Sequence, residues 1–149
     1  MRTAGTFKVV SFTPASLVPE PAVETALPVG VATLEKHYEG EGLEGRSATL
    51  FTAAFDQASG IGTYVAMESF EGSLEGREGA FNFVHSATTD GGPHRGTDHF
   101  LIVPGSGTAA LAGITGSGGL LVEEDGTHRV WFEYRLPGLP GEAQARGRG

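Results

Sequence analysis

The chain has 149 residues, which suits one domain with a substantial hydrophobic core, and it carries a net charge of −8, ten Lys and Arg residues and no cysteine. Nucleic-acid binding needs clustered basic side chains, so we expect no nucleic-acid partner, and the lack of cysteine excludes disulfides and thiolate metal sites. No segment reaches the ~18 consecutive apolar residues of a membrane span, and the first residues lack the apolar core of a signal peptide. We therefore expect a cytoplasmic protein that does not bind membranes.

Polar and apolar residues alternate with a period of two along most of the chain, which is typical of half-buried β-strands. Turn-forming pairs such as Ser59-Gly60 and Asp125-Gly126 separate the alternating segments and predict short antiparallel connections. The expected strands are 3–12, 29–39, 46–56, 61–71, 78–89, 96–103, 108–122 and 127–136. They predict an all-β fold, either a sandwich or an eight-stranded antiparallel β-barrel. We favour the barrel because closure leaves no exposed sheet edge.

Two segments depart from the alternating pattern. Residues 13–28 hold four of the eight prolines, so we interpret them as a Pro-rich crossover packed over one end of the barrel, with a short helical turn near residues 22–26. After Leu136 the chain is rich in Gly, Pro and charged residues. We therefore expect a β-barrel domain over residues 1–137 and a disordered, flexible tail over 138–149.

The segments on either side of Glu75-Gly76 predict a hairpin with a two-residue turn. Because alternate residues of a strand point to the same side, this turn fixes which residues share a face. One of the two faces is rich in aromatic side chains, so we expect it to point into the barrel. Its predicted cross-strand pairs are Phe70 with Phe81, Glu68 with Phe83 and Ala66 with His85, and Tyr64 lies on the same face.

Glu68 and His85 are the unusual members of this aromatic face. Burying a carboxylate and an imidazole is costly unless they pair, contact water or bind a ligand. Their predicted positions are diagonal neighbours, roughly 7–8 Å apart between backbones, which long side chains can bridge. Acid and base groups in an apolar setting indicate a functional site. The two residues could instead form a structural polar pair, and a one-residue shift in the turn would place them on opposite faces.

The last predicted strand alternates in the same way. Phe132 and Tyr134 belong to the face that is expected to point inward, which would place the Tyr134 hydroxyl among the interior polar groups. Trp131 belongs to the charged outer face, where it either lies under arginine side chains, which we favour, or marks a homodimer contact.

No metal or cofactor is predicted. The five histidines, at positions 37, 85, 94, 99 and 128, do not have the spacing of a metal site. The glycine-rich run 105–113 lacks the lysine of a phosphate-binding loop and the strand–turn–helix context of a dinucleotide-binding motif.

The spacing of several glycines resembles a bacterial family known as domain of unknown function 3224. The resemblance runs from about Thr3 to Leu136, and its motifs are Gly40 with Gly45, the segment 68–85 and the segment 104–118. That family is similar in fold to allene oxide cyclase, which implies an eight-stranded antiparallel barrel with an internal cavity. The allene oxide cyclase motif cannot be placed on these residues one by one, so the resemblance implies no catalytic role for any of them.

The expected function is that of a cofactor-independent cyclase or isomerase that acts on a hydrophobic, unsaturated small molecule, such as a ring-forming step in natural-product biosynthesis. Glu68 would be the acid/base or carbonyl-polarising group, His85 its partner, and Tyr64 and Tyr134 hydrogen-bond donors. Two alternatives remain: a non-enzymatic carrier of a small hydrophobic molecule, and a filled interior with the function on a surface or dimer interface. The residues expected to contact the ligand are Phe70, Phe81, Phe83, Phe132 and Met67.

Overall fold

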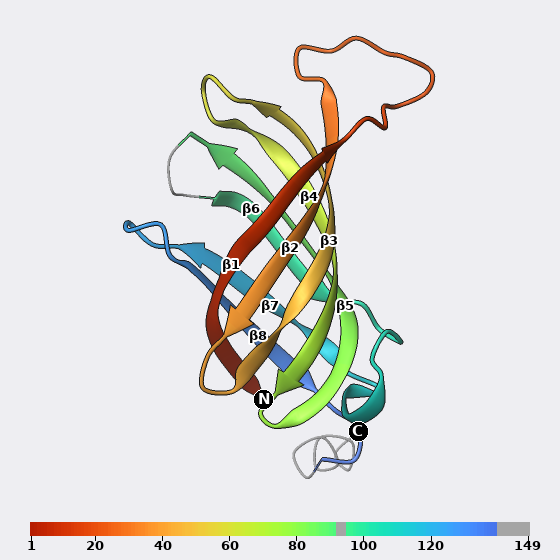
Figure 1. Cartoon of the computed structure of the whole chain (residues 1–149), viewed down its shortest axis with the longest axis vertical. Helices are drawn as coiled ribbons and strands as arrows, with labels where there is room; N and C mark the ends of the chain where they lie inside the picture. The colour runs from red at the N-terminus through yellow and green to blue at the C-terminus, as the bar shows by residue number, and fades with distance from the viewer. Residues whose placement is uncertain (92–94, 140–149) are drawn as a thin grey trace.

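The structure is a computed structural model that describes residues 1–91 and 95–139. The described residues form eight strands and one helical turn, η1 (Ala109–Leu111), which follow one another along the chain (Figure 1). The strands are β1 (Arg2–Ala15), β2 (Val29–Glu39), β3 (Leu43–Asp56), β4 (Ile61–Leu74), β5 (Arg77–Asp90), β6 (Arg95–Ile102), β7 (Thr115–Val122) and β8 (His128–Arg135).

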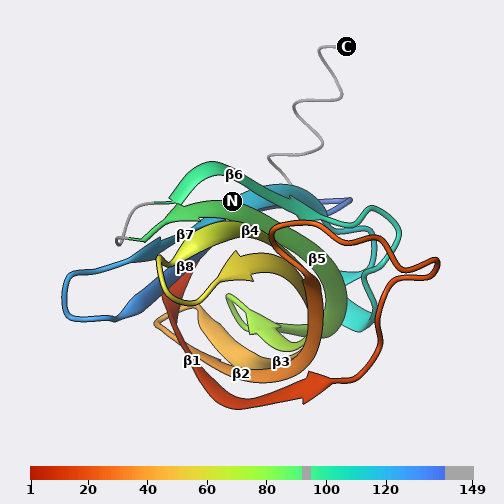
Figure 2. The same ribbon diagram turned by 90° about the horizontal axis from the view of Figure 1, so that it is seen from above.

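Each strand pairs antiparallel with the next one, and β1 also pairs with β8, so the sheet closes into a ring. Figure 2 looks along this ring from one end. The β1–β8 pairing covers only the first half of β1, from Arg2 to Phe7. Beyond Phe7, β1 pairs with β2 alone, and a bulge interrupts that pairing between Val9 and Ser11. The predicted all-β architecture of eight antiparallel strands is confirmed.

The register predicted for the β4–β5 hairpin is also confirmed. Phe70 lies opposite Phe81, and Glu68 lies opposite Phe83. Both residues of the turn have positive φ angles, 52° at Glu75 and 81° at Gly76. These angles define the hairpin turn whose own twist matches the twist of the two strands.

Two predicted segments differ from the structure, and the first is 108–122. Its first half is a loop that contains η1, and β7 begins only at Thr115. The loop is fixed to β5 because the Thr108 N–H donates to the Ala80 carbonyl at 2.9 Å and the Ala80 N–H donates to Thr108 Oγ1 at 3.0 Å. Leu111 and Ile114 are fully buried. The apolar residues that suggested a strand therefore belong to the hydrophobic core through a loop.

The second difference concerns the Pro-rich segment. β1 extends to Ala15, and Pro14 is tolerated there because β1 has only one neighbour at this point. Residues 16–28 form no helical turn and project from the ring (Figure 1). They do not pack over its end, since Leu17 and Val23 are 70% and 75% exposed.

The interior of the ring has two unlike ends. At the packed end, near the β4–β5 turn, aromatic rings contact one another with centroids 5.1–6.1 Å apart. At the open end, near the β3–β4 turn, several inward-facing positions hold small residues such as Ala53 and Gly62. The rings that fill the packed end belong to Phe70, Phe81, Phe83 and Phe132, each at most 2% exposed.

The hairpin turn can be tested with a matched pair of glycine substitutions. A Cβ added at Gly76 or at Gly30 would meet no atom within 4 Å, so neither change creates a clash. Only Gly76 has a left-handed backbone, which is disfavoured for alanine by about 1–2 kcal/mol. We expect Gly76→Ala to lower the free energy of unfolding by about that amount in urea titrations. An equal loss in Gly30→Ala would contradict this explanation.

Candidate functional site

A buried carboxylate is the centre of the polar cluster inside the ring. Glu68, on β4, is 1% exposed. Lys36 of β2 donates to Glu68 Oε2 at 2.7 Å. Two hydroxyl groups donate to Glu68 Oε1: Tyr38 of β2 at 2.5 Å and Ser47 of β3 at 2.8 Å. The cluster formed by Lys36, Tyr38, Ser47 and Glu68, which we call the Glu68 cluster, joins three adjacent strands.

The Glu68 cluster balances its own charge. Lys36 is 6% exposed and its ammonium group also lies 4.8 Å from the centre of the Phe7 ring, so the cation is held on two sides. Burial and the neighbouring Glu68 charge raise the pKa of Tyr38 well above its ordinary value, which keeps the phenol protonated as a donor. Three donors, one of which carries the opposite charge, satisfy the Glu68 carboxylate where it is buried.

The described hydrogen bonds of the Glu68 carboxylate come from Lys36, Tyr38 and Ser47, and a direct Glu68–His85 contact stays a prediction. His85 Nδ1 lies 3.1 Å from the Tyr64 hydroxyl oxygen, and the tautomer of the imidazole decides which group donates.

The sequence also contains a sign that Lys36 is the charged partner of Glu68. Lys36 occupies an inward position of β2 between Leu34 and Tyr38, which is an unusual place for a charge unless an opposite charge faces it.

His85 and Tyr64 are part of a row of aromatic rings around the interior of the open end. The Phe51 ring stacks on the Tyr64 ring with centroids 5.3 Å apart and an interplanar angle of 24°. The Tyr64 ring meets the His85 ring edge-on at 5.4 Å. The row begins at Phe12 on β1 and continues past His85 to Phe100 on β6, with centroid distances of 6.0 and 5.7 Å. We call Phe12, Phe51, Tyr64, His85 and Phe100 the aromatic belt.

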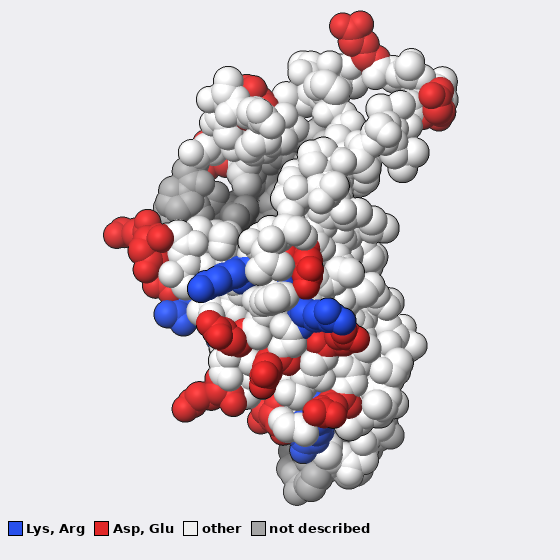
Figure 3. All heavy atoms as spheres, in the orientation of Figure 1, with Lys and Arg blue, Asp and Glu red and all other residues white. Residues whose placement is uncertain are grey.

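The upper part of the belt is open to solvent. Phe12 points inward, as its contact with Phe51 shows, yet it is 55% exposed. Phe55 is four residues after Phe51 on β3, so it lies on the same inward-facing side, and it is 43% exposed. In the space-filling view the molecule is hollowed at this end, between the β3–β4 hairpin tip and the segment that follows β1 (Figure 3). Inward-facing aromatic side chains that contact solvent indicate an entrance for an apolar molecule.

The other residues proposed from the sequence lie elsewhere. Phe70, Phe81, Phe83 and Phe132 point inward but fill the packed end, where they contact one another. Tyr134 is buried there as well, and its hydroxyl donates to Glu75 in the hairpin turn. Burial and this carboxylate raise the pKa of Tyr134. Met67 is 44% exposed on the outer face, in an apolar row across β3–β6. The residues of that row are Leu50, Met67, Val84 and Leu101.

Trp131 lies on the outer face, as its alternation predicts. The guanidinium group of Arg2 lies 5.4 Å from the centre of the Trp131 ring, which is the arginine packing favoured from the sequence. A homodimer contact at this position stays a prediction.

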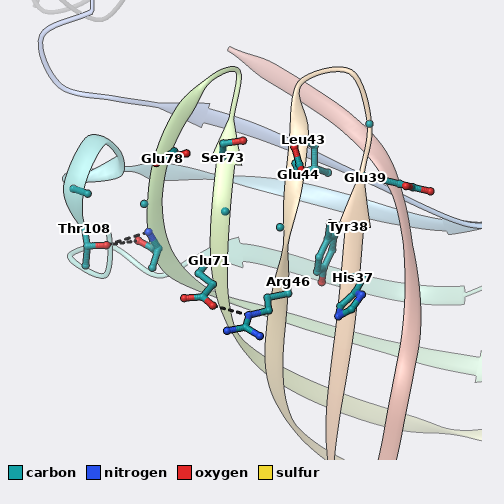
Figure 4. A pocket seen from close by; sticks show the side chains of 16 residues that line it. His37, Tyr38, Glu39, Leu43, Glu44, Arg46, Glu71, Ser73, Glu78 and Thr108 are labelled. Atoms are coloured by element: carbon teal, nitrogen blue, oxygen red, sulfur yellow. Dashed lines mark hydrogen bonds and ion pairs between the residues drawn. The ribbon is translucent and has the colours of Figure 1, made fainter.

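A groove on the outside of the ring has different chemistry. It has a volume of about 1140 Å³ and lies beside the β2–β3 and β4–β5 turns (Figure 4). Its exposed side chains are mostly charged, and Arg46 binds Glu71 across it at 2.6 Å. Four of its lining residues are glutamates, Glu39, Glu44, Glu71 and Glu78. These charged side chains favour contact with water over contact with an apolar molecule. We therefore place the candidate site at the open end of the interior.

Two further properties bear on the classes of function. Among the side chains of residues 1–91 and 99–139, no three His, Asp or Glu groups gather as they would around a metal ion. His94 lies outside the described residues, as do residues 140–149 of the predicted tail. In the described part of the chain, no helix has the length and apolar character needed to cross a bilayer.

The fold and site together define a small all-β domain with a ring of eight strands, a buried charged cluster and an aromatic belt at one open end. The chain belongs to the family described as "Protein of unknown function (DUF3224)", whose model matches residues 3–134. It is similar to a DUF3224-family protein of unknown function from Shewanella oneidensis MR-1, whose crystal structure was determined at 1.84 Å resolution. The two are 28% identical with a TM-score of 0.74, and the match covers 91% of this chain and 97% of the other. No curated protein matches the chain.

The Glu68 cluster can be tested by removing its cation. Lys36→Met leaves a buried carboxylate without its opposite charge, so we expect it to lower the free energy of unfolding by about 3–5 kcal/mol. Adding Glu68→Gln to Lys36→Met should restore part of that loss, because the unpaired charge is then removed. The matched control is Arg46→Met, which breaks an exposed pair and should leave stability almost unchanged. Similar losses in both single variants, measured by urea unfolding, would contradict this account.

The buried tyrosines predict how the protein responds to alkali. The pKa values of Tyr38 and Tyr134 are raised in the folded state, so the unfolded chain loses these protons first as the pH rises. Stability is therefore unaffected by these groups below about pH 10 and falls above it. At about pH 11 we expect the native protein to show less phenolate absorbance at 295 nm than the chain unfolded in guanidinium chloride. Equal absorbance in a protein that is still folded would rule out buried, protonated phenols.

Proposed function

We propose that the protein binds a small hydrophobic molecule inside the open end of the ring. The observation that carries this proposal is the exposure of inward-facing aromatic side chains, Phe12 and Phe55, on a wall that continues into the buried part of the aromatic belt. Small ligands bind in concave, mostly apolar sites that contain a few oriented polar groups. The Tyr64–His85 pair supplies polar groups of this kind on the same wall.

A second candidate is the cofactor-independent cyclase or isomerase expected from the sequence, with the allene oxide cyclase-like barrel as its fold. The observation that favours it is the hydrogen bond between Tyr64 and His85, since a phenol beside an imidazole can give a proton to a bound carbonyl and recover it. Glu68 has a different part in this proposal. Its carboxylate is fully bonded within the Glu68 cluster, so it holds Lys36 and Tyr38 in place below the ligand. A carrier releases its ligand unchanged, whereas a cyclase or isomerase releases a rearranged product of the same mass.

Adjacent alanines on β3 provide a test of binding. Ala53 points into the open end and Ala54 points outward, and both are partly buried. The neutral dye N-phenyl-1-naphthylamine, which fluoresces in apolar surroundings, is the probe. We expect Ala53→Leu to fill the entrance and weaken dye binding at least about tenfold, which corresponds to about 1.4 kcal/mol. The control Ala54→Leu should bind within about twofold of the original chain. Equal effects of the two variants, or no binding by the original chain, would overturn the proposal.

A further inference from the structure

The chemistry of the open end also specifies the class of ligand. We propose that the site selects an uncharged, flat molecule with conjugated or aromatic bonds, which lies against the aromatic belt above the Glu68 cluster. This inference rests on the proposed binding function and deepens it. It comes from two independent observations, the charge balance of the interior and the arrangement of its rings.

The charge balance disfavours ligands with a net charge. Among the residues whose side chains are described, the buried Lys, Arg, Asp and Glu residues are Lys36 and Glu68, which bind each other at 2.7 Å. An anionic ligand would have to take Lys36 away from Glu68 and leave that carboxylate buried and unpaired. A cationic ligand would have to take Glu68 away from Lys36 and the two hydroxyl groups that donate to it. Either exchange leaves one buried charge without a partner, so an uncharged molecule is favoured.

The arrangement of rings favours a flat molecule. The aromatic belt spans β1, β3, β4, β5 and β6, so ring surfaces follow the wall around much of the open end. The residues beside these rings in the cross-strand rows are small: Ala32 and Ala66 flank Phe51, and Ala53 and Ala87 flank Tyr64. These small neighbours do not project over the rings, and Ala32, Ala66 and Ala87 are themselves buried, at most 3% exposed. Aromatic faces gain additional attraction from another π-system placed over them or at their edge.

Three naphthalene-sized probes test the preference for an uncharged ligand and the preference for a flat ligand separately. 2-Acetylnaphthalene is flat and neutral, 2-naphthoate is flat and anionic, and 2-acetyldecahydronaphthalene is neutral but saturated. Each is used at neutral pH to displace N-phenyl-1-naphthylamine from the full-length protein. We expect 2-naphthoate to bind at least about tenfold more weakly than 2-acetylnaphthalene, and the saturated ketone about three- to tenfold more weakly.

Two variants connect each preference to its residues. Glu68→Gln leaves the Lys36 charge uncompensated, so the affinity for 2-naphthoate should rise relative to that for 2-acetylnaphthalene. Phe51→Leu keeps the site apolar but removes one ring, so the preference for the flat ketone over the saturated one should shrink. Met67→Leu, on the outer face, is the control and should change neither ratio.

The possible outcomes are distinct. If 2-naphthoate binds as well as 2-acetylnaphthalene, or if the saturated ketone does, the inference is wrong although the binding function stands. If the dye and all three probes fail to bind, the proposed function fails as well. The inference is supported if the original chain shows both expected preferences and Phe51→Leu loses the preference for the flat ketone over the saturated one. That result is sufficient even if Glu68→Gln does not fold.

Discussion

The interior of this protein depends on the need to satisfy one buried carboxylate. Glu68 lies where water does not reach it, and an unpaired charge there would destabilise the fold by several kcal/mol. Its oxygens are bonded by Lys36, Tyr38 and Ser47, which come from β2 and β3. Because these strands must lie in one register for the three bonds to form, the cluster also fixes how β2, β3 and β4 pair. A shift by one residue would turn each donor toward solvent.

The Glu68 cluster lies between the two unlike halves of the ring. On one side, phenylalanine rings contact one another at the distances expected of a close-packed core. On the other side, alanines and glycines alternate with aromatic side chains, and several of those rings contact solvent. The packed half supplies the hydrophobic stabilisation, so the open half can keep exposed apolar surface, which the proposed binding function would use. In the proposed function, this rigid support beneath the wall would limit the entropy lost when a ligand binds.

The sequence predicts local features of this structure better than contacts between residues that are far apart in the chain. The β4–β5 hairpin was predicted to the residue because a two-residue turn and a two-residue period together define a local register. The inward direction of Phe132 and Tyr134 followed from the same alternation. The partners of Glu68 were missed because they lie on strands whose register with β4 depends on longer stretches of chain. The residues 108–114 were assigned to a strand because apolar composition alone does not distinguish a strand from a buried loop.

The separation of β1 from β8 beyond Phe7 leaves part of β1 with unpaired backbone groups at one edge. Such an edge could recruit a strand from another molecule and begin aggregation. The bulge between Val9 and Ser11 interrupts the regular spacing of the edge, and Pro14 provides no N–H for a neighbouring strand. Both irregularities therefore act as safeguards that let this part of β1 remain an unpaired edge of the closed ring without inviting intermolecular sheet growth.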